Sequence, residues 1–211
     1  MAASKRLFLI DGSALAYRAY FAFVRNPLIN RKGMNTSAIY GFTNSLLKLI
    51  EAEKPDYLAV VFDSPEPTFR HQMYPEYKAT REKMPDDMAA QLPYLDQVVK
   101  AFNIPQIVRP GVEADDVIGT LATRAAREGF EAFMVTADKD FLQLVTDKVK
   151  VYNNTKKGDE IEILDPAGVE AKFGVPPGQV VDVLGLMGDT SDNIPGVEGV
   201  GEKSAVELVK R

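Results

Sequence analysis

Short, uninterrupted apolar runs alternate along this chain with longer segments in which apolar residues recur every three or four positions. The runs at residues 7–10, Tyr57–Phe62 and 132–137 are typical of strands that are buried on both faces. Helical periodicity is clearest over Ser37–Glu53 and behind Asp116. This alternation predicts an α/β domain with a largely parallel central sheet that is flanked by helices.

Further elements follow from shorter patterns. We expect helices at residues 14–23, 88–102, 141–146, 177–187 and 202–210, a strand at 104–108, and an edge hairpin formed by 149–152 and 161–164. Asp165 followed by Pro166 predicts a helix start, and Gly129 and Gly174 are the expected ends of two helices. After about residue 170 no strand pattern remains, which predicts a small helical module.

Composition narrows the chemistry. The 211 residues include no cysteine and one histidine, His71, so disulfides, thiolate nucleophiles and cysteine or multi-histidine metal sites are excluded. No apolar run approaches the ~20 residues that span a bilayer, and the run at 7–10 is too short for a signal peptide. We therefore expect a cytoplasmic protein with no membrane partner. The net charge of −5 does not decide for or against nucleic acid, because bound cations would mask part of it.

Acidic residues follow the predicted strands at the point where each strand ends. Because ligands of parallel sheets bind beyond the carboxyl ends of the strands, we expect these side chains to share one crevice. The nine carboxylates in question are Asp11, Asp63, Glu113, Asp115, Asp116, Asp138, Asp140, Asp189 and Asp192. A single Asp at such a position is usually a helix cap or turn residue. The convergence of several of them favours a metal site.

Such a cluster needs positive charge. Two like charges about 4 Å apart repel by roughly 4 kcal/mol at an effective dielectric near 20, and several such pairs would rival the ~5–15 kcal/mol stability of a domain. Oxygen ligands without His or Cys favour Mg²⁺, with Mn²⁺ as a substitute. More than four carboxylates suits two ions, which together clamp the attacking and leaving oxygens of a phosphoryl transfer to water.

Five blocks of sequence carry a resemblance to a known family. They read Leu-Ile-Asp11-Gly-Ser, Val-Phe-Asp63-Ser-Pro, Gly-Val-Glu113-Ala-Asp115-Asp116, Thr-Ala-Asp138-Lys-Asp140 and Gly-Asp189-Thr-Ser-Asp192-Asn-Ile-Pro-Gly-Val. In this order they resemble the 5′-nuclease family, which includes the flap endonucleases, and most of all the N-terminal 5′→3′ exonuclease domains of bacterial DNA polymerase I. The resemblance implies a PIN-like fold with a helical arch at about 66–90 and a C-terminal helix-3-turn-helix module.

The resemblance also implies how the chain is divided. We expect a catalytic domain over residues 1–170 and a truncated DNA-binding module over 171–211. The ligands implied for one metal ion are Asp11, Asp63 and Asp115. Those implied for the other ion are Asp115, Asp138, Asp140 and Asp189. The carboxylates expected to act through water or on the ligands are Glu113, Asp116 and Asp192.

Residues 66–83 interleave arginine and lysine with aromatic residues, a composition that tracks a single strand by charge and base stacking. On composition alone, a solvated loop is an equal alternative. The resemblance identifies this segment with the arch through which a free 5′ end passes, and places Arg70, Lys78 and Arg81 at the scissile phosphate. It also assigns Tyr17 to stacking on a base beside the scissile bond and Arg18 to DNA contact.

The segment 196–204 nearly matches a nucleotide-binding P-loop, but Glu202 interrupts the pattern and no strand precedes it. We interpret it as a helix–turn–helix hairpin that offers backbone N–H groups to a DNA phosphate, with a plain tight turn as the structural alternative. The residues expected to contact DNA are Gly196, Gly199, Gly201, Lys203 and Ser204. By resemblance, a K⁺ ion is also expected on the carbonyl groups of the turn.

Together these features predict a divalent-metal-dependent nuclease that hydrolyses DNA at 5′ ends, flaps or nicks by a two-metal mechanism. We expect a nucleoid-associated monomer that binds DNA with a single-stranded 5′ flap or a nicked junction, with a polymerase domain as a candidate partner in a longer protein. A PIN-type ribonuclease is one alternative, but such domains lack the segment 66–83 and the hairpin at 188–205. A DNA-binding module with a degraded site is another, and the complete acidic set argues against it.

Overall fold

A six-stranded, mostly parallel sheet forms the centre of the molecule. The structure is a computed structural model that describes residues 4–154 and 161–211. The strand order is β3-β2-β1-β4-β5-β6, and within the described residues only the β5–β6 pairing is antiparallel. The strands are β1 (Arg6–Asp11), β2 (Tyr57–Phe62), β3 (Gln106–Val108), β4 (Glu131–Val135), β5 (Val149–Asn153) and β6 (Glu162–Leu164). The predicted edge hairpin is thus present, and most of its connection lies outside the described residues.

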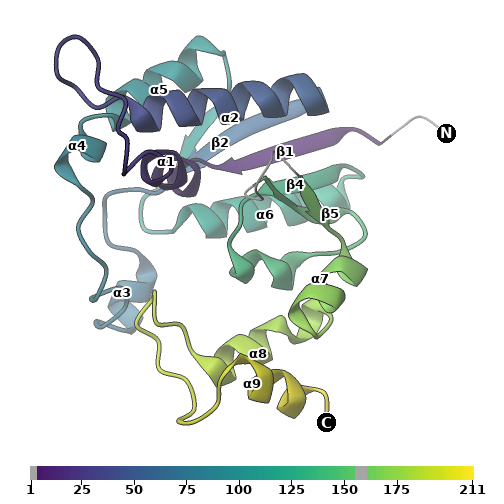
Figure 1. Cartoon of the computed structure of the whole chain (residues 1–211). Helices are drawn as coiled ribbons and strands as arrows, with labels where there is room; N and C mark the ends of the chain where they lie inside the picture. Colours follow the sequence, from purple (N-terminus) through teal and green to yellow (C-terminus); the bar gives the residue numbers. More distant parts are fainter. Residues whose placement is uncertain (1–3, 155–160) are drawn as a thin grey trace.

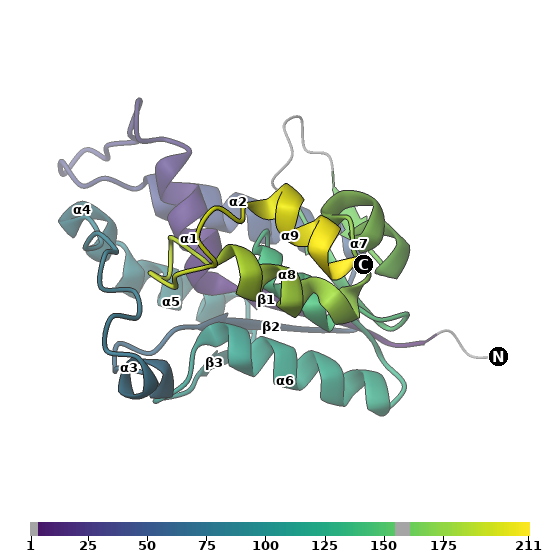
Figure 2. The ribbon, with the colours of Figure 1, turned by 90° about the horizontal axis from the view of Figure 1, so that it is seen from below.

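Helices cover both faces of the sheet (Figures 1 and 2). The helices on one face are α1 (Gly12–Phe21), α2 (Ser37–Glu53), α4 (Asp86–Ala89) and α5 (Leu92–Ala101). Those on the other face are α6 (Ala114–Arg127), α7 (Pro166–Phe173), α8 (Val180–Met187) and α9 (Glu202–Val209). The short remaining helices are α3 (Phe69–Met73) and the 3₁₀ helices η1 (Lys139–Leu144) and η2 (Pro177–Gln179).

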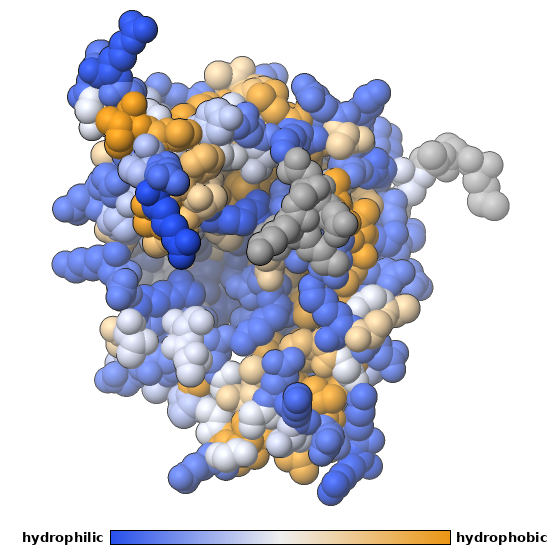
Figure 3. Space-filling view, in the orientation of Figure 1, coloured by the Kyte–Doolittle hydropathy of each residue, from blue (hydrophilic) through white to orange (hydrophobic). Residues whose placement is uncertain are grey.

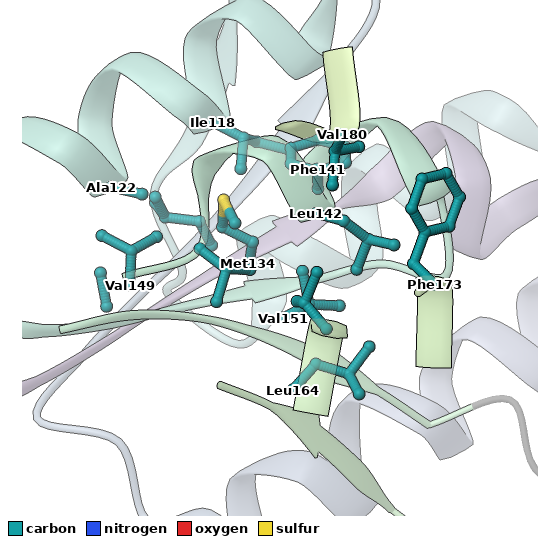
Figure 4. Packing of buried hydrophobic residues seen from close by; sticks show 14 of the residues in the cluster. Ile118, Ala122, Met134, Phe141, Leu142, Val149, Val151, Leu164, Phe173 and Val180 are labelled. Atoms are coloured by element: carbon teal, nitrogen blue, oxygen red, sulfur yellow. The ribbon is translucent and has the colours of Figure 1, made fainter. Parts of the chain in front are cut away.

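The alternation of side chains along the strands produces two separate cores. Phe8 and Ile10 of β1 pack on the α1–α2–α5 side, whereas Leu9 between them packs on the α6 side. On that second side, Ile118 of α6 and Met134 of β4 are fully buried against η1 and α8 (Figure 4). Continuous apolar runs are therefore needed in these strands, because both faces are covered.

The chain reverses its direction of winding at β1. From β1 it passes through α1 and α2 to β2 on one side, and α6 later carries it across to β4 on the other side. In parallel α/β sheets such a switch point leaves a crevice beyond the carboxyl ends of the two flanking strands. That edge is where Asp11 ends β1.

Several predicted helices have different bounds in the structure, among them 14–23, which is observed as α1, and 177–187, which is divided between η2 and α8. The segment 88–102 is divided at Ala90 and Gln91, because Pro93 lacks the N–H that a continuous helix would need and instead starts α5. The segment 141–146 is the 3₁₀ helix η1, which begins earlier because the Asp138 side chain accepts a hydrogen bond from the Asp140 N–H. In the segment 66–90, only α3 and α4 are helical, and turns connect them.

Two glycines allow the loop after α8 to fold tightly on itself. Gly188 has φ +71°, and a Cβ added there would lie 2.3 Å from the Gly196 nitrogen. A Cβ on Gly196 would lie 2.4 Å from the carbonyl carbon of Met187. The loop 188–195 is therefore closed at its base by backbone contact that only glycine permits.

In the described ranges no helix is both long and apolar enough to cross a membrane.

Candidate active site

Carboxylates from four elements meet at the carboxyl edge of the sheet. Asp11 ends β1, Asp63 follows β2, Asp138 follows β4, and Asp115 lies in the first turn of α6. Asp115 interacts electrostatically with Asp11, Asp138 and Asp63. The expected convergence of these side chains on one edge is therefore found, although they span more than half of the sequence.

Local hydrogen bonds explain why each acid points to this edge. Asp11 Oδ1 accepts from the Ala14 N–H at 2.8 Å and caps α1. Asp63 Oδ1 accepts from the Ala114 N–H at 2.9 Å, which joins the end of β2 to the start of α6. Asp11 is thus a helix cap and Asp63 binds the first N–H of α6, while both belong to the cluster. The capping interpretation is confirmed for Asp11, and the metal site stays a prediction.

Burial and mutual repulsion raise the pKa of three of these acids. The pKa of Asp115 rises to about 8, first because of burial and then because of its carboxylate neighbours. The pKa of Asp11 rises to about 6, because burial outweighs the hydrogen bond from Ala14. The pKa of Asp140 also rises to about 6, through burial and through the charges of Asp138 and Asp189. The cluster therefore favours bound cations or protons.

A cavity of about 950 Å³ opens over Asp115, Asp138 and Asp140, and we call it the acidic pocket; Asp11 and Asp63 do not line it. Figure 3 shows the face concerned, hollowed between α1 and the loop 188–195 and surrounded by hydrophilic side chains. Its acidic lining residues are Glu113, Asp115, Asp116, Asp138, Asp140 and Asp192. Its basic lining residues include Arg70, Lys78 and Arg81.

The arm, residues 66–83, lies over this pocket and is held there by ion pairs. Arg70 forms two hydrogen bonds with the carboxylate of Asp116, at 2.6 and 2.7 Å. Lys78 Nζ lies 2.6 Å from Glu113 Oε1. The Arg70 hydrogen bonds are the largest cause of the lowered pKa of Asp116, and they raise the pKa of Arg70 itself. Arg81 in turn lies 2.7 Å from Asp192 Oδ1, so three of the four lysine and arginine side chains of the arm pair with acids.

Tyr77 is a residue of this site for which no individual role was predicted. Its side chain is buried, and its hydroxyl lies 3.0 Å from both Glu113 Oε2 and Asp192 Oδ2. The next residue, Lys78, has φ +57°, and its N–H donates to the Asp192 carbonyl. A positive φ at a lysine is uncommon, and the contact of the arm with Asp192 holds it. In the sequence, Tyr77 is only one of several aromatic residues of the arm.

Lys139 is a second residue to which no role was given. Its Nζ lies 3.0 Å from Asp189 Oδ2. Burial alone would lower the pKa of Lys139, but the hydrogen bond to Asp189 and the nearby Asp140 and Asp138 raise it overall. The pKa of Asp189 is lowered, because Lys139 outweighs the effect of burial. The one signal in the sequence is the position of Lys139 between two aspartates.

The nine carboxylates therefore divide into two groups. Four have a basic partner within the chain, namely Glu113, Asp116, Asp189 and Asp192. Within residues 4–154 and 161–211, no lysine or arginine forms an ion pair with the other five, which are Asp11, Asp63, Asp115, Asp138 and Asp140. The chain itself thus supplies part of the positive charge that this cluster needs.

The oxygen donors of these carboxylates decide which metal ion could bind at this edge. In the described part of the chain, no group of three or more His, Asp or Glu side chains is already arranged to hold a metal ion. The five carboxylates without a basic partner nevertheless offer only oxygen donors, as hard divalent cations prefer. Burial first, and then neighbouring carboxylates, raise the pKa of Asp11, Asp115 and Asp140, so the uncompensated negative charge there is costly. The donor set therefore fits a divalent cation in its chemistry.

Tyr17 and Arg18 differ in their exposure to solvent. Tyr17 on α1 is 37% exposed and lines a second cavity, of about 730 Å³, on the other side of the arm. This second cavity is also lined by Asp63 and Lys78, so Tyr17 is near the acids. Arg18 is half-buried and interacts with Asp11. Burial lowers the pKa of Arg18, and Asp11 opposes that effect.

The glycine-rich hairpin lies apart from the acidic pocket, at the start of α9. Gly199 has φ +77°, and Gly201 is the N-cap of α9 without a side-chain cap. Lys203 and Ser204 are exposed in the first turn of that helix. Of the predicted DNA-contacting glycines, Gly196 also closes the loop 188–195, so its presence has a packing reason.

Comparison with known proteins identifies the family. Residues 6–174 match the model of the 5′-3′ exonuclease, N-terminal resolvase-like domain, and residues 175–211 match that of the 5′-3′ exonuclease, C-terminal SAM fold. The chain is 44% identical over 207 residues to the 5′-3′ exonuclease of Aquifex aeolicus, covering 98% of this chain and 70% of that protein. It is 46% identical over 212 residues to the DNA polymerase I of Bacillus subtilis and spans 24% of its length.

Solved structures share the fold. T5 5′-exonuclease with bound divalent zinc ions superposes with a TM-score of 0.77 at 23% identity, covering 98% of this chain and 75% of that one. The catalytic core of Rad2 in complex with a DNA substrate superposes with a TM-score of 0.65 at 20% identity, covering 98% and 61%. With the family models, the sequence relatives and this fold in agreement, the chain belongs to the 5′-3′ exonuclease family.

Proposed function

We propose that this chain hydrolyses phosphodiester bonds of DNA at 5′ ends, flaps or nicks, as a 5′→3′ exonuclease and flap endonuclease. The observation that carries the proposal is the meeting of Asp11, Asp63, Asp115 and Asp138 beneath a basic arm. The names of the relatives support it, since they include a 5′-3′ exonuclease, a metal-bound T5 5′-exonuclease and a Rad2 core bound to DNA.

We propose two divalent cations, with Mg²⁺ as the first choice. Asp11, Asp63 and Asp115 are the ligands that we assign to one, and Asp138, Asp140 and Asp189, with Asp115 shared, to the other. When bound, such ions would activate a water molecule and stabilise the charge on the leaving 3′-oxygen. The assignment is the one that the resemblance to the 5′-nuclease family implies, and the absence of a basic partner for five of these six carboxylates supports it.

The arm residues are proposed to bind the scissile phosphate. Arg70, Lys78 and Arg81 line the acidic pocket and already lie next to carboxylates. A phosphate that enters this pocket would replace those carboxylates as the acceptor of hydrogen bonds from the three side chains. The cations are therefore positioned before the substrate arrives. Tyr17, exposed on the far side of the arm, is placed to stack on a base.

The part from residue 171 onward is proposed to hold the duplex. The first N–H groups of a helix have no partner within it, and the start of α9 has no side-chain cap. These N–H groups, next to the exposed Lys203 and Ser204, suit a DNA phosphate. We further propose that Gly199 and Gly201 let the backbone approach that phosphate closely, and that a K⁺ ion binds the carbonyl groups of the turn.

The test is cleavage of a 5′-labelled flap DNA in Mg²⁺. We expect the wild type to release labelled 5′ fragments and Asp115→Asn to lose this activity by more than about 100-fold, as for loss of a charge-stabilising group. Asp147→Asn, which removes an exposed aspartate outside the pocket, should cleave as the wild type does. Equal cleavage by wild type and Asp115→Asn would refute the site.

The same assay separates the alternatives. A flap made of RNA tests for a PIN-type ribonuclease, which would cleave it in preference to DNA. A module with a degraded site would bind the flap DNA in a mobility-shift assay without cleaving it in Mg²⁺ or Mn²⁺. The DNA polymerase I relatives support the proposal that this part acts beside a polymerase domain. We also propose that the chain is a monomer, which sedimentation of the chain alone tests.

A further inference from the structure

The ion pair between Lys139 and Asp189 joins two segments fifty residues apart in the sequence. Lys139 begins η1 between Asp138 and Asp140, and its Nζ lies 3.0 Å from Asp189 Oδ2. The two side chains are 37% and 19% exposed, so water screens the pair only in part. A positive charge therefore already stands among three of the carboxylates assigned to the second cation.

The other oxygen of Asp189 is committed to the backbone. Its Oδ1 accepts hydrogen bonds from the N–H groups of Ser191 at 2.7 Å and Asp192 at 3.2 Å. The backbone of Asp189 is fixed as well, because it exchanges two hydrogen bonds with Ile194, at 2.9 and 2.8 Å. The carboxylate is thus held in one orientation, and Oδ2 is the oxygen left for a cation.

We propose that Lys139 is an internal counter-ion of Asp189, which a divalent cation must displace from Oδ2 before it can bind there. The inference rests on the proposed function and deepens it. Lys139 and a divalent cation compete for Asp189 Oδ2. Occupancy of the second metal position therefore depends on Lys139 as well as on the number of carboxylates. Lys139 lowers the affinity of that position for divalent cations and keeps the loop 188–195 joined to η1 while the position holds no ion.

The other metal position differs in this respect. Asp11, Asp63 and Asp115 form no ion pair with a lysine or arginine in the described parts of the chain, and Arg18 acts on Asp11 only at longer range. A cation there displaces no ion-paired lysine or arginine. We therefore expect two classes of divalent-cation site. One has the higher affinity and is not affected by Lys139, and the other has the lower affinity because of Lys139.

The experiment measures binding of Mg²⁺ alone to the whole chain by isothermal titration calorimetry, repeated with Mn²⁺ by electron paramagnetic resonance. Lys139→Met keeps much of the side-chain volume and removes the charge. We expect it to tighten the weaker class by about fivefold, the size expected for loss of a partly exposed ion pair, and to leave the tighter class unchanged. Lys172→Met is the matched control, since Lys172 pairs with Glu162 at 2.6 Å away from the acidic pocket.

A double-mutant cycle isolates the pair. In an Asp189→Asn background, Lys139→Met should no longer change the affinity of either class. Lys139→Gln replaces Lys139→Met where circular dichroism shows that the methionine variant is unfolded. Unchanged binding in both Lys139 variants, with the wild type binding two ions, overturns the inference alone. A wild type that binds no Mg²⁺ or Mn²⁺ overturns the proposed function as well, so the two failures are distinguishable.

Discussion

The hydroxyl of Tyr77 lies 3.0 Å from Oδ2 of Asp192, although the two residues are 115 positions apart in the sequence. The same hydroxyl lies 3.0 Å from Glu113 Oε2. A tyrosine hydroxyl has one proton, so at any moment it donates to one of the two carboxylates. Burial and these two acids raise the pKa of Tyr77, which keeps the proton on it. Tyr77 thus joins the arm, the start of α6 and the loop 188–195.

Replacement of this hydroxyl should loosen the arm. In Tyr77→Phe the ring remains, but two carboxylates lose a shared donor, which costs about 1.5–3 kcal/mol for a hydrogen bond to a charged group. We expect a lower free energy of unfolding in urea and a higher KM on flap DNA. Tyr94→Phe is the control, because the Tyr94 side chain is 45% exposed. Wild-type values of both quantities for Tyr77→Phe would show that the hydroxyl does not hold the arm.

Asn193 makes a second connection between the loop and the arm. Its side-chain N–H donates to the Glu76 carbonyl at 2.8 Å, and its φ is +56°. Glycine adopts this φ without strain, so Asn193→Gly removes the donor and keeps the backbone. We expect faster trypsin cleavage after Lys78 and Arg81, together with a several-fold higher KM.

The matched control is Asn103→Gly. Asn103 has φ +55° and follows α5, away from the arm. Both variants change an asparagine of positive φ to glycine, so any general effect of backbone freedom appears in both. Equal trypsin sensitivity of the two variants would contradict a role for Asn193 in positioning the arm.

The acidic pocket should make the metal-free protein less stable at high pH. The pKa values of Asp115, at about 8, and of Asp11 and Asp140, at about 6, lie above the unfolded value of 3.8. The folded state therefore binds more protons over this window, and stability falls as pH rises from about 5 to about 8.5. The pKa values of Asp116 and Asp189 are lowered. Their carboxylates therefore become protonated, and stop stabilising the folded state, only at lower pH.

Thermal unfolding in EDTA measures this effect. We expect the Tm of the wild type to fall between pH 5 and 8.5, and Mg²⁺ to restore it most at pH 8.5. Asp115→Asn removes the most strongly shifted group, so its unfolding free energy at pH 8.5 should exceed that of the wild type by about 2 kcal/mol or more, at about 1.4 kcal/mol per pKa unit. Near pH 4, close to the unfolded pKa, the two should be nearly equal. A wild-type Tm that stays level or rises over this range would be inconsistent with the pKa values.

The sequence was sufficient to predict the sheet and the acids at its edge. Continuous apolar runs such as Tyr57–Phe62 mark strands buried on both faces, and parallel strands bring the residues after them to one edge. Asp11 and Asp63 could therefore be grouped without coordinates. Sheet topology alone predicts that they lie close together, because their proximity depends on where the strands end and not on which rotamers the side chains adopt.

The pairing of those acids could not be predicted in the same way. Lys139 pairs with Asp189 and Tyr77 with Asp192 through the path of two loops, and loop paths depend on many weak contacts that leave no period in the sequence. The same holds for the interruption of the segment 88–102. Pro93 explains why a helix starts there, but the turn before it holds a buried glutamine whose partners lie on another helix.

That glutamine, Gln91, is fully buried and caps α2 from outside. Its Oε1 accepts from the N–H groups of Ala38 at 2.9 Å and Ile39 at 3.3 Å, and its Nε2 donates to the Asp87 carbonyl at 3.0 Å. Thr36, the N-cap of α2, makes no side-chain cap of its own. Gln91→Leu would therefore leave the first N–H groups of α2 buried without an acceptor, at a cost of about 1–3 kcal/mol.

We expect the midpoint of urea unfolding to fall in Gln91→Leu, while flap cleavage per folded molecule at 25 °C stays close to that of the wild type, because Gln91 does not line the acidic pocket. Gln97→Leu, at an exposed position of α5 outside the acidic pocket, controls for the change of residue type. Loss of cleavage without loss of stability in Gln91→Leu would instead mean that α2 and the α4–α5 turn position the catalytic edge directly. In that case the two cores of the sheet could not be treated as independent supports of the site.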